Sequence, residues 1–161
     1  MFDFVTQDLE LNTNGKARLV LIWFRASQLI VRNRFSLVLF FPFLFLYRII
    51  VEWFMGIELN WDLRIGKLRL YHGQGLIIHP DVIIGEGCTL RCNTVIGNQG
   101  DEGGVPNIGN NVDVGANVVI IGDIDIGSNV TIGAGSVVTK SIPDNSMVIG
   151  NPGRVTNKNP I

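Results

Sequence analysis

The chain has 161 residues, a formal net charge of −1 and two cysteines, and 47% of its residues are hydrophobic. This length fits one domain with an appended segment rather than two independent enzymes, and the balanced charge gives no sign of a nucleic-acid partner. Cys88 and Cys92 lack the spacing of a zinc finger. We therefore expect both to act as small apolar residues without a disulfide, which fits a protein in a reducing compartment.

Residues 1–56 are expected to form a short hydrophobic α-helical segment. An acidic lead-in, residues 1–15, lacks the basic start and cleavage site of a signal peptide. A helical pattern follows over residues 16–33, and a second, very apolar segment covers residues 36–55. This region is the source of the positive mean hydropathy of +0.32.

The second segment is not expected to span a membrane. Its uncharged run, Phe35 to Tyr47, is shorter than the ~20 residues that a spanning helix needs, and Pro42 interrupts it. We therefore expect a helix buried between subunits. Basic residues flank the aromatic-rich faces, which leaves a peripheral membrane contact open. The expected location is cytoplasmic, either free or at the inner face of the membrane.

A six-residue repeat organises the rest of the chain, and it matches neither a helix nor a simple strand. Such hexads are a signature of β-solenoids. The predicted fold class is an all-β solenoid, a left-handed parallel β-helix, with glycines and asparagines (Asn110, Asn111, Asn117, Asn129) at its corners. The branched apolar residues at the six-residue spacing are Ile78, Ile84, Leu90, Ile96, Ile108, Val114, Ile120, Ile126, Ile132 and Val138.

Two interruptions of the repeat are informative. The glycine-rich run from Gly97 to Gly104 has no apolar residue to bury, so a loop is predicted within residues 97–107. Leu59 and Ile65 are one step out of register with the later hexads, which places an irregularity near His72. The β-helix domain is predicted over residues 57–153, in about five coils of roughly 4.8 Å rise. A polar, frayed tail is expected at 154–161.

His72 is the first candidate for chemistry. Glycines lie on both sides of it, and an imidazole that titrates near neutrality can take a proton from an attacking hydroxyl. Glu58 precedes it by about one coil, where a carboxylate could orient the imidazole. The alternative is a corner histidine bonded to a carbonyl. His79, which precedes a proline, is expected to be a turn residue, and two histidines are too few for a metal site.

The hexads, together with four motifs, resemble the serine acetyltransferase family of hexapeptide acyltransferases. The resemblance covers about residues 56–155. The hydrophobic segment before the solenoid is similar to the branch of the colanic acid and exopolysaccharide biosynthesis acetyltransferases. The motifs are residues 71–76 (YHGQGL), 94–97 (TVIG), 132–138 (IGAGSVV) and 150–154 (GNPGR), and among the hexads residues 114–119 (VGANVV) carry the same resemblance.

The resemblance implies a homotrimer with active sites between neighbouring solenoids, and acetyl-CoA as the donor without a metal. His72 matches the family's catalytic base, and Glu58 stands where serine acetyltransferases carry an aspartate that pairs with it. The loop from Gly97 to Gly104 borders the acceptor pocket. The residues expected to contact acetyl-CoA are Gly97, Ala116, Ala134, Lys140 and Arg154.

Two departures from the family pattern argue against serine as the acceptor. The Arg-His pair that precedes the proline closing the family's loop is replaced by Gly104 and Val105, before Pro106. The aspartate before the catalytic histidine is replaced by Tyr71. A free amino acid carries two charges that a pocket must satisfy, and these groups are missing. An uncharged hydroxyl of a capsule or exopolysaccharide precursor fits better.

The sequence therefore predicts an acetyl-CoA-dependent O-acetyltransferase that acetylates a sugar hydroxyl by direct attack on the thioester. Two alternatives stay open. One is serine O-acetyltransferase activity. The other is a non-catalytic trimeric scaffold, which would not bind acetyl-CoA.

Overall fold

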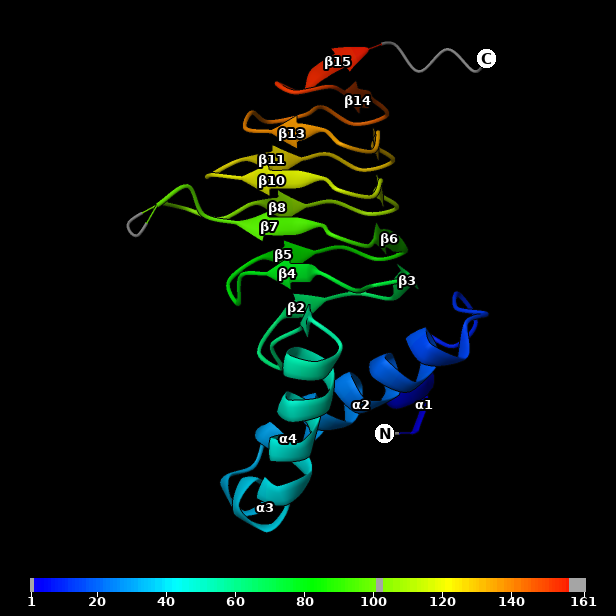
Figure 1. Cartoon of the computed structure of the whole chain (residues 1–161), viewed down its shortest axis with the longest axis vertical. Helices are drawn as coiled ribbons and strands as arrows, with labels where there is room; N and C mark the ends of the chain where they lie inside the picture. Colours follow the sequence, from blue (N-terminus) through cyan, green and yellow to red (C-terminus); the bar gives the residue numbers. More distant parts are fainter. Residues whose placement is uncertain (1, 101–102, 157–161) are drawn as a thin grey trace.

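The computed structural model describes residues 2–100 and 103–156. A helical cap lies at one end of a coiled β-domain, and the described chain ends at the opposite end (Figure 1). The asparagines before α2 and α3 cap them: Asn14 accepts the Lys16 N–H, and Asn33 accepts the Phe35 N–H. The helices are α1 (Phe2–Thr6), α2 (Gly15–Val31), α3 (Arg34–Leu39), α4 (Phe41–Tyr47) and the π-helix η1 (Arg48–Phe54).

Within residues 2–100 and 103–156, fifteen short strands form three sheets, which are the faces of a prism. Face 1 has the strand order β1-β4-β7-β10-β13, face 2 β11-β8-β5-β2, and face 3 β15-β14-β12-β9-β6-β3. The chain passes from face 1 to face 2 to face 3 in each coil. All pairings are parallel except that of β14 with β15. The predicted left-handed parallel β-helix is confirmed.

The bounds of the strands follow the hexads. They are β1 (Ile57–Glu58), β2 (Arg64–Ile65), β3 (Leu68–Tyr71), β4 (Leu76–Ile78), β5 (Ile83–Ile84), β6 (Cys88–Arg91), β7 (Val95–Gly97), β8 (Asn107–Ile108), β9 (Asp113–Val114), β10 (Val119–Ile121), β11 (Asp125–Ile126), β12 (Thr131–Ile132), β13 (Val137–Val138), β14 (Met147–Ile149) and β15 (Arg154–Thr156).

The core of the prism contains two inward residues for each hexad. Every predicted hexad residue from Ile78 to Val138 is at most 3% exposed. A second inward position lies two residues earlier, as at Val112 before Val114 and Val118 before Ile120. Alternate residues of a strand point to the same side. A short strand can therefore bury both the hexad residue and the residue two positions before it.

The corners depend on left-handed backbone. Asn111, Asn117 and Asn129 have φ between +54° and +58°, as predicted. Their side chains also stack between coils, since the Asn111 amide donates to Asn129 at 3.3 Å. Asn110 also lies at a corner, in the turn after β8, but it is not among the residues of positive φ that a left-handed corner would require. Its side chain instead accepts the Glu86 N–H at 2.8 Å, an alternative that a short amide offers equally well.

The predicted irregularity at His72 is present. Tyr71 pairs with Arg91, and Ile77 pairs with Val95 in the next coil. Between these pairs the lower coil has residues 72–76 and the upper coil has residues 92–94. The corner that holds His72 therefore has two extra residues. The core is uninterrupted there, because Leu76 and Ile78 are still buried.

The lead-in closes the open end of the solenoid, which the sequence did not predict. Asp8 accepts the Leu68 N–H at 2.7 Å, and Asn12 bonds to both the Leu68 carbonyl and the Leu70 N–H at 2.8 Å. These side chains satisfy the free edge of β3, as a further strand would. Arg25 of α2 binds Asp8 and is 1% exposed.

The other segments agree with the predictions in part. Helix α2 corresponds to the predicted helix 16–33, but the segment 36–55 is divided into α3, α4 and η1, with Pro42 at the start of α4. The loop between β7 and β8 leaves the prism (Figure 1). The prediction of a frayed tail is wrong for Arg154–Thr156, because this segment pairs with β14 as strand β15. Residues 157–161 lie outside the described residues. Cys88 and Cys92 are both free.

Candidate active site

His72 lies at the corner between faces 3 and 1, in the first complete coil above the cap. Its backbone has a φ of +50°, in the left-handed region that L-residues adopt at a cost of about 1–2 kcal/mol. The Gln74 N–H donates to the His72 carbonyl at 2.7 Å, and the Gly75 N–H donates to Gly56 at 2.8 Å, which holds this conformation. A strained residue in an exposed position is a reason to look for function.

The imidazole of His72 is exposed and makes no hydrogen bond within residues 2–100 and 103–156. It lies edge-on to the ring of Tyr71, with 6.4 Å between the ring centroids. The corner histidine bonded to a carbonyl, which the sequence left open, is not found in the described part of the chain.

Glu58 lies on the outer side of β1, and its register partner is Ile77. It is thus in the coil beneath His72, displaced along face 1. Among the described residues Glu58 forms neither a hydrogen bond nor an ion pair with His72. The two residues are on adjacent coils, as predicted, and their pairing stays a prediction.

A cavity of about 200 Å³ lies beside His72, between the lead-in and β3. Two of its lining residues, Arg69 and Tyr71, stack, with the guanidinium 5.3 Å from the ring centroid. Arg91 covers the same ring at 5.5 Å and pairs with Asp113. The sequence did not predict this cavity, because its two walls are more than fifty residues apart in the chain. It is lined by Leu11, Asn12, Thr13, Asn14, Arg69, Leu70, Tyr71 and His72.

Ala116 and Ala134 stack at the same corner as His72, in higher coils. The Gly135 N–H donates to the Ala116 carbonyl at 2.9 Å, so the two alanines follow one column. Ala134 is exposed and Ala116 is half-buried. The structure thus brings two predicted acetyl-CoA contacts into line with the predicted base.

The other predicted contacts lie elsewhere. Gly97 ends β7 at the corner between faces 1 and 2, and a Cβ added there would lie 3.5 Å from the Cβ of His79. Lys140 is exposed and follows β13 at the same corner, and Arg154 begins β15. Five residues separate the two corners along face 1, or about 15 Å at roughly 3.3 Å per residue.

His79 is a turn residue, as expected. Its Nδ1 accepts the Asp81 N–H at 3.3 Å. In the described ranges no group of three or more His, Cys, Asp or Glu side chains is placed to hold a metal ion. Cys88 is buried, and burial raises the pKa of its thiol.

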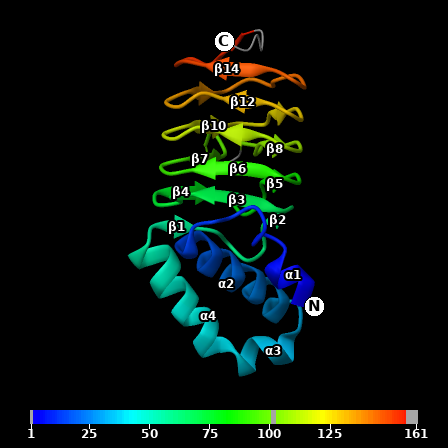
Figure 2. The same cartoon turned by 90° about the vertical axis from the view of Figure 1, so that its right-hand side faces the viewer.

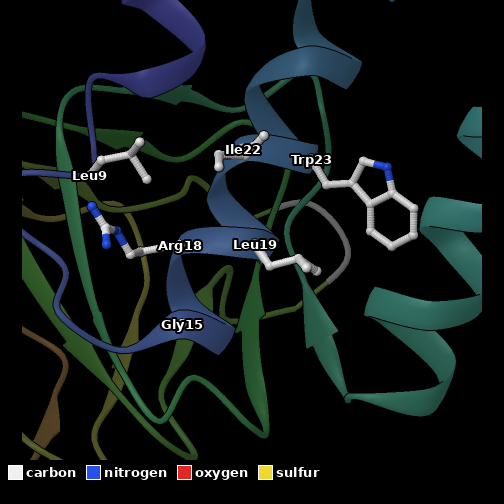
Figure 3. A pocket seen from close by; sticks show the side chains of 6 residues that line it. All are labelled: Leu9, Gly15, Arg18, Leu19, Ile22 and Trp23. Atoms are coloured by element: carbon white, nitrogen blue, oxygen red, sulfur yellow. The ribbon is translucent and has the colours of Figure 1, made fainter.

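A second cavity, about 540 Å³, is an apolar groove along α2 and is separate from His72. Figure 3 shows Leu9, Leu19 and Ile22 around it, with Trp23 directed toward the neighbouring helices. Trp23 packs edge-on against Phe43 of α4, with 5.8 Å between centroids. No carboxylate, histidine or cysteine lines the groove, so we assign no catalytic role to it.

The sequence matches known proteins over much of its length. The family model "Bacterial transferase hexapeptide (six repeats)" matches residues 106–140. The "Putative colanic acid biosynthesis acetyltransferase WcaB" of Escherichia coli K12 is 49% identical over 116 residues, which are 71% of this chain and 72% of the relative. A serine acetyltransferase of Staphylococcus aureus is 39% identical over 109 residues, 66% of this chain and 51% of that one.

Solved structures of serine acetyltransferases have the same fold. The soybean apoenzyme superposes with a TM-score of 0.76 at 28% identity and covers 89% of this chain. The Brucella abortus enzyme in complex with coenzyme A superposes with a TM-score of 0.77 at 25% identity and covers 88% of this chain. This chain spans 58% and 56% of the lengths of these two enzymes.

Proposed function

The chain belongs to the hexapeptide-repeat acyltransferases, in the branch that contains WcaB and is related to the serine acetyltransferases, and from this we propose that it transfers acetyl from acetyl-CoA to a sugar hydroxyl of a capsule or exopolysaccharide precursor. The observation that carries the proposal is His72, an exposed imidazole held in left-handed backbone beside a polar cavity. Acetyl-CoA as the donor is supported by the structural relative that binds coenzyme A.

In the proposed reaction His72 is the general base. Its neutral imidazole nitrogen takes the proton of the acceptor hydroxyl as the oxygen attacks the thioester carbonyl. The tetrahedral intermediate collapses by breaking the C–S bond, the ester remains on the sugar, and the proton passes from the imidazolium to the CoA thiolate. A covalent acyl-enzyme is not needed in this scheme.

Glu58 is proposed to position His72. A carboxylate in the adjacent coil favours the imidazolium that forms in the transition state and selects the tautomer that presents a free nitrogen. The distance between them must shorten when substrate binds, since catalytic hydrogen bonds often tighten only in the complex. Removal of the Glu58 carboxylate should lower kcat and change the pH profile of the reaction more than it changes KM.

The acceptor is proposed to lie in the cavity beside His72. Arg69 and Tyr71 line one wall of it with hydrogen-bond donors, and Asn14 brings an amide group to the opposite wall. The loop residues that replace the family's Arg-His pair, Gly104 and Val105, carry no charge for an amino-acid substrate. The WcaB relative is described as a colanic acid biosynthesis enzyme, which supports a polysaccharide acceptor.

A homotrimer is proposed because the candidate residues lie at two different corners of the prism within a single chain. His72 and the alanine column lie at one corner, whereas Gly97 and the loop lie at the next corner, about 15 Å away. A neighbouring copy could bring its loop to the His72 corner and complete a groove for acetyl-CoA. Ala116 and Ala134 would then contact the pantetheine arm, because small side chains leave the backbone open to a ligand.

The test is CoA release from acetyl-CoA, corrected for hydrolysis, with an acceptor panel of oligosaccharide repeat units, nucleotide sugars and L-serine. We expect acceptor-dependent release with a sugar, reduced by about 10² or more in His72→Ala. His79→Ala is the matched control and should retain activity. Robust turnover of L-serine would refute the sugar acceptor. If the wild-type protein neither binds acetyl-CoA nor releases CoA, the chain is a scaffold.

A further inference from the structure

The far end of the cap exposes an unusual number of large apolar side chains. Phe35 is 76% exposed and Phe41 is 59% exposed. Helices α3 and α4 meet at the end of the molecule remote from the solenoid (Figures 1 and 2). A surface of this kind in a folded protein marks an interaction site. We define the cap tip by its exposed hydrophobic residues, which are Phe35, Leu37, Val38, Leu39, Phe40, Phe41, Phe45 and Leu46.

The charge around the cap tip has one sign. Between residues 11 and 51 the sequence contains six basic residues and no Asp or Glu, although the whole chain has a net charge of −1. Arg32 and Arg34 are exposed beside Phe35 and form no ion pair within the described residues. Arg48 forms an ion pair with Glu52, and the buried Arg25 forms an ion pair with Asp8. Lys16 and Arg18 lie at the start of α2, so Arg32 and Arg34 are the free positive charges beside the cap tip.

We propose that the cap tip docks on an anionic lipid surface. Phenylalanine-rich helices with arginines at their margin have the composition of segments that lie in the interface of a bilayer, where rings enter the acyl boundary and guanidinium groups contact phosphates. In the described part of the chain no helix combines the length and hydropathy needed to cross a bilayer. The cap tip would thus lie on the membrane.

A second copy of the chain fits this surface less well. A two-fold contact through the cap tips would bring Arg32 and Arg34 of both copies together. No acidic residue between 11 and 51 could pair with them, and like charges at an interface are unfavourable. An anionic bilayer supplies the opposite charge and the apolar layer together.

The proposed orientation has a consequence for the acetyl acceptor. His72 directly follows β3, and β3 lies at the end of the solenoid nearest the cap (Figure 2). A docked molecule would hold this corner nearer to the bilayer than any later coil. This consequence rests on the proposed function, and it favours an acceptor attached to a lipid; the docking itself does not depend on catalysis.

The test is flotation of the full chain with vesicles of phosphatidylcholine alone or mixed with phosphatidylglycerol. We expect the protein to bind the mixed, anionic vesicles and to bind the neutral vesicles only weakly. Binding to the anionic vesicles should decrease as the salt concentration rises. Arg32→Gln with Arg34→Gln should reduce partitioning to the anionic vesicles by about fivefold for each arginine. Phe35→Ser with Phe41→Ser should reduce it by roughly tenfold or more.

Two controls keep this test separate from catalysis. Val155→Ser removes an exposed apolar side chain at the opposite end of the molecule and should float as the wild type does. His72→Asn should also float normally, and the Phe35/Phe41 variant should retain CoA release with a soluble acceptor.

Three results would overturn the docking proposal. The first is equal recovery of the wild type on neutral and anionic vesicles, and the second is no flotation at all. The third is lipid-free self-association in sedimentation experiments that is abolished by Phe35→Ser with Phe41→Ser, because that would assign the cap tip to a second copy.

Discussion

The left-handed backbone of His72 allows its catalytic role to be separated from a structural one. A side chain at a φ of +50° costs about 1–2 kcal/mol, which glycine avoids, although glycine loses roughly 0.5–1 kcal/mol through its greater freedom in the unfolded chain. The imidazole has no hydrogen bond to lose within the described residues. His72→Gly should therefore leave the free energy of unfolding unchanged or raise it by up to about 1.5 kcal/mol, while CoA release falls by about 10² or more.

The measurement is urea unfolding at fixed protein concentration, followed by tryptophan fluorescence, alongside the CoA-release assay. His72→Asn should behave like His72→Gly, since asparagine tolerates this region, whereas the β-branched His72→Val should lose about 1–2 kcal/mol. His79→Gly is the control of opposite sign: it removes a turn hydrogen bond and should destabilise the protein by about 1 kcal/mol. A parallel loss of stability and activity in His72→Gly would refute the reasoning and make His72 a structural residue.

Three further predictions concern the cap, the thiols and the CoA groove. Asp8→Ala should destabilise the protein by about 3–5 kcal/mol in urea because it leaves Arg25 charged and buried, and a smaller loss in the double variant with Arg25→Met would confirm the coupling. Because burial raises the pKa of Cys88, the contribution of its neutral thiol to the free energy of unfolding is complete below the usual thiol pKa of about 8.5 and is lost as the pH rises above that value. An alkylating reagent should modify Cys92 faster than the buried Cys88, and equal rates of modification would contradict the burial of Cys88. Ala134→Trp should raise KM for acetyl-CoA by roughly tenfold with a smaller change in kcat, and an unchanged KM would exclude the alanine column from the CoA groove.

The solenoid was predictable from the sequence because its physics is local and repeated. Each coil must bury a branched residue on every face, so Ile108, Val114 and Ile120 recur at six-residue intervals and are at most 2% exposed. The irregular corner at His72 was detectable as well, because the extra residues shift the phase of the repeat. A fold whose core is defined by a period can be read from that period.

The closure of the solenoid was not predictable in the same way. Asp8 and Asn12 bind the edge of β3 across 56 to 60 positions of sequence, and no periodicity connects them to Leu68. An acidic residue near the N-terminus usually remains solvated, so nothing in the composition marks Asp8 as 1% exposed. The cavity beside His72 was missed for the same reason, since the lead-in supplies one of its walls.

The corner of His72 also shows where this fold can change without loss of stability. The two extra residues of that corner leave the core unchanged, because Leu70 and Leu90 still pair across the coils and are both buried. Tyr71 is the exposed last residue of β3, beside this corner and outside the buried hexad pattern, so the aspartate that the family resemblance places there can be replaced without a change in the core. Under the proposed function we therefore expect acceptor preference to change through residues at this corner and in the β7–β8 loop, while the buried faces of the prism keep the same hexad pattern.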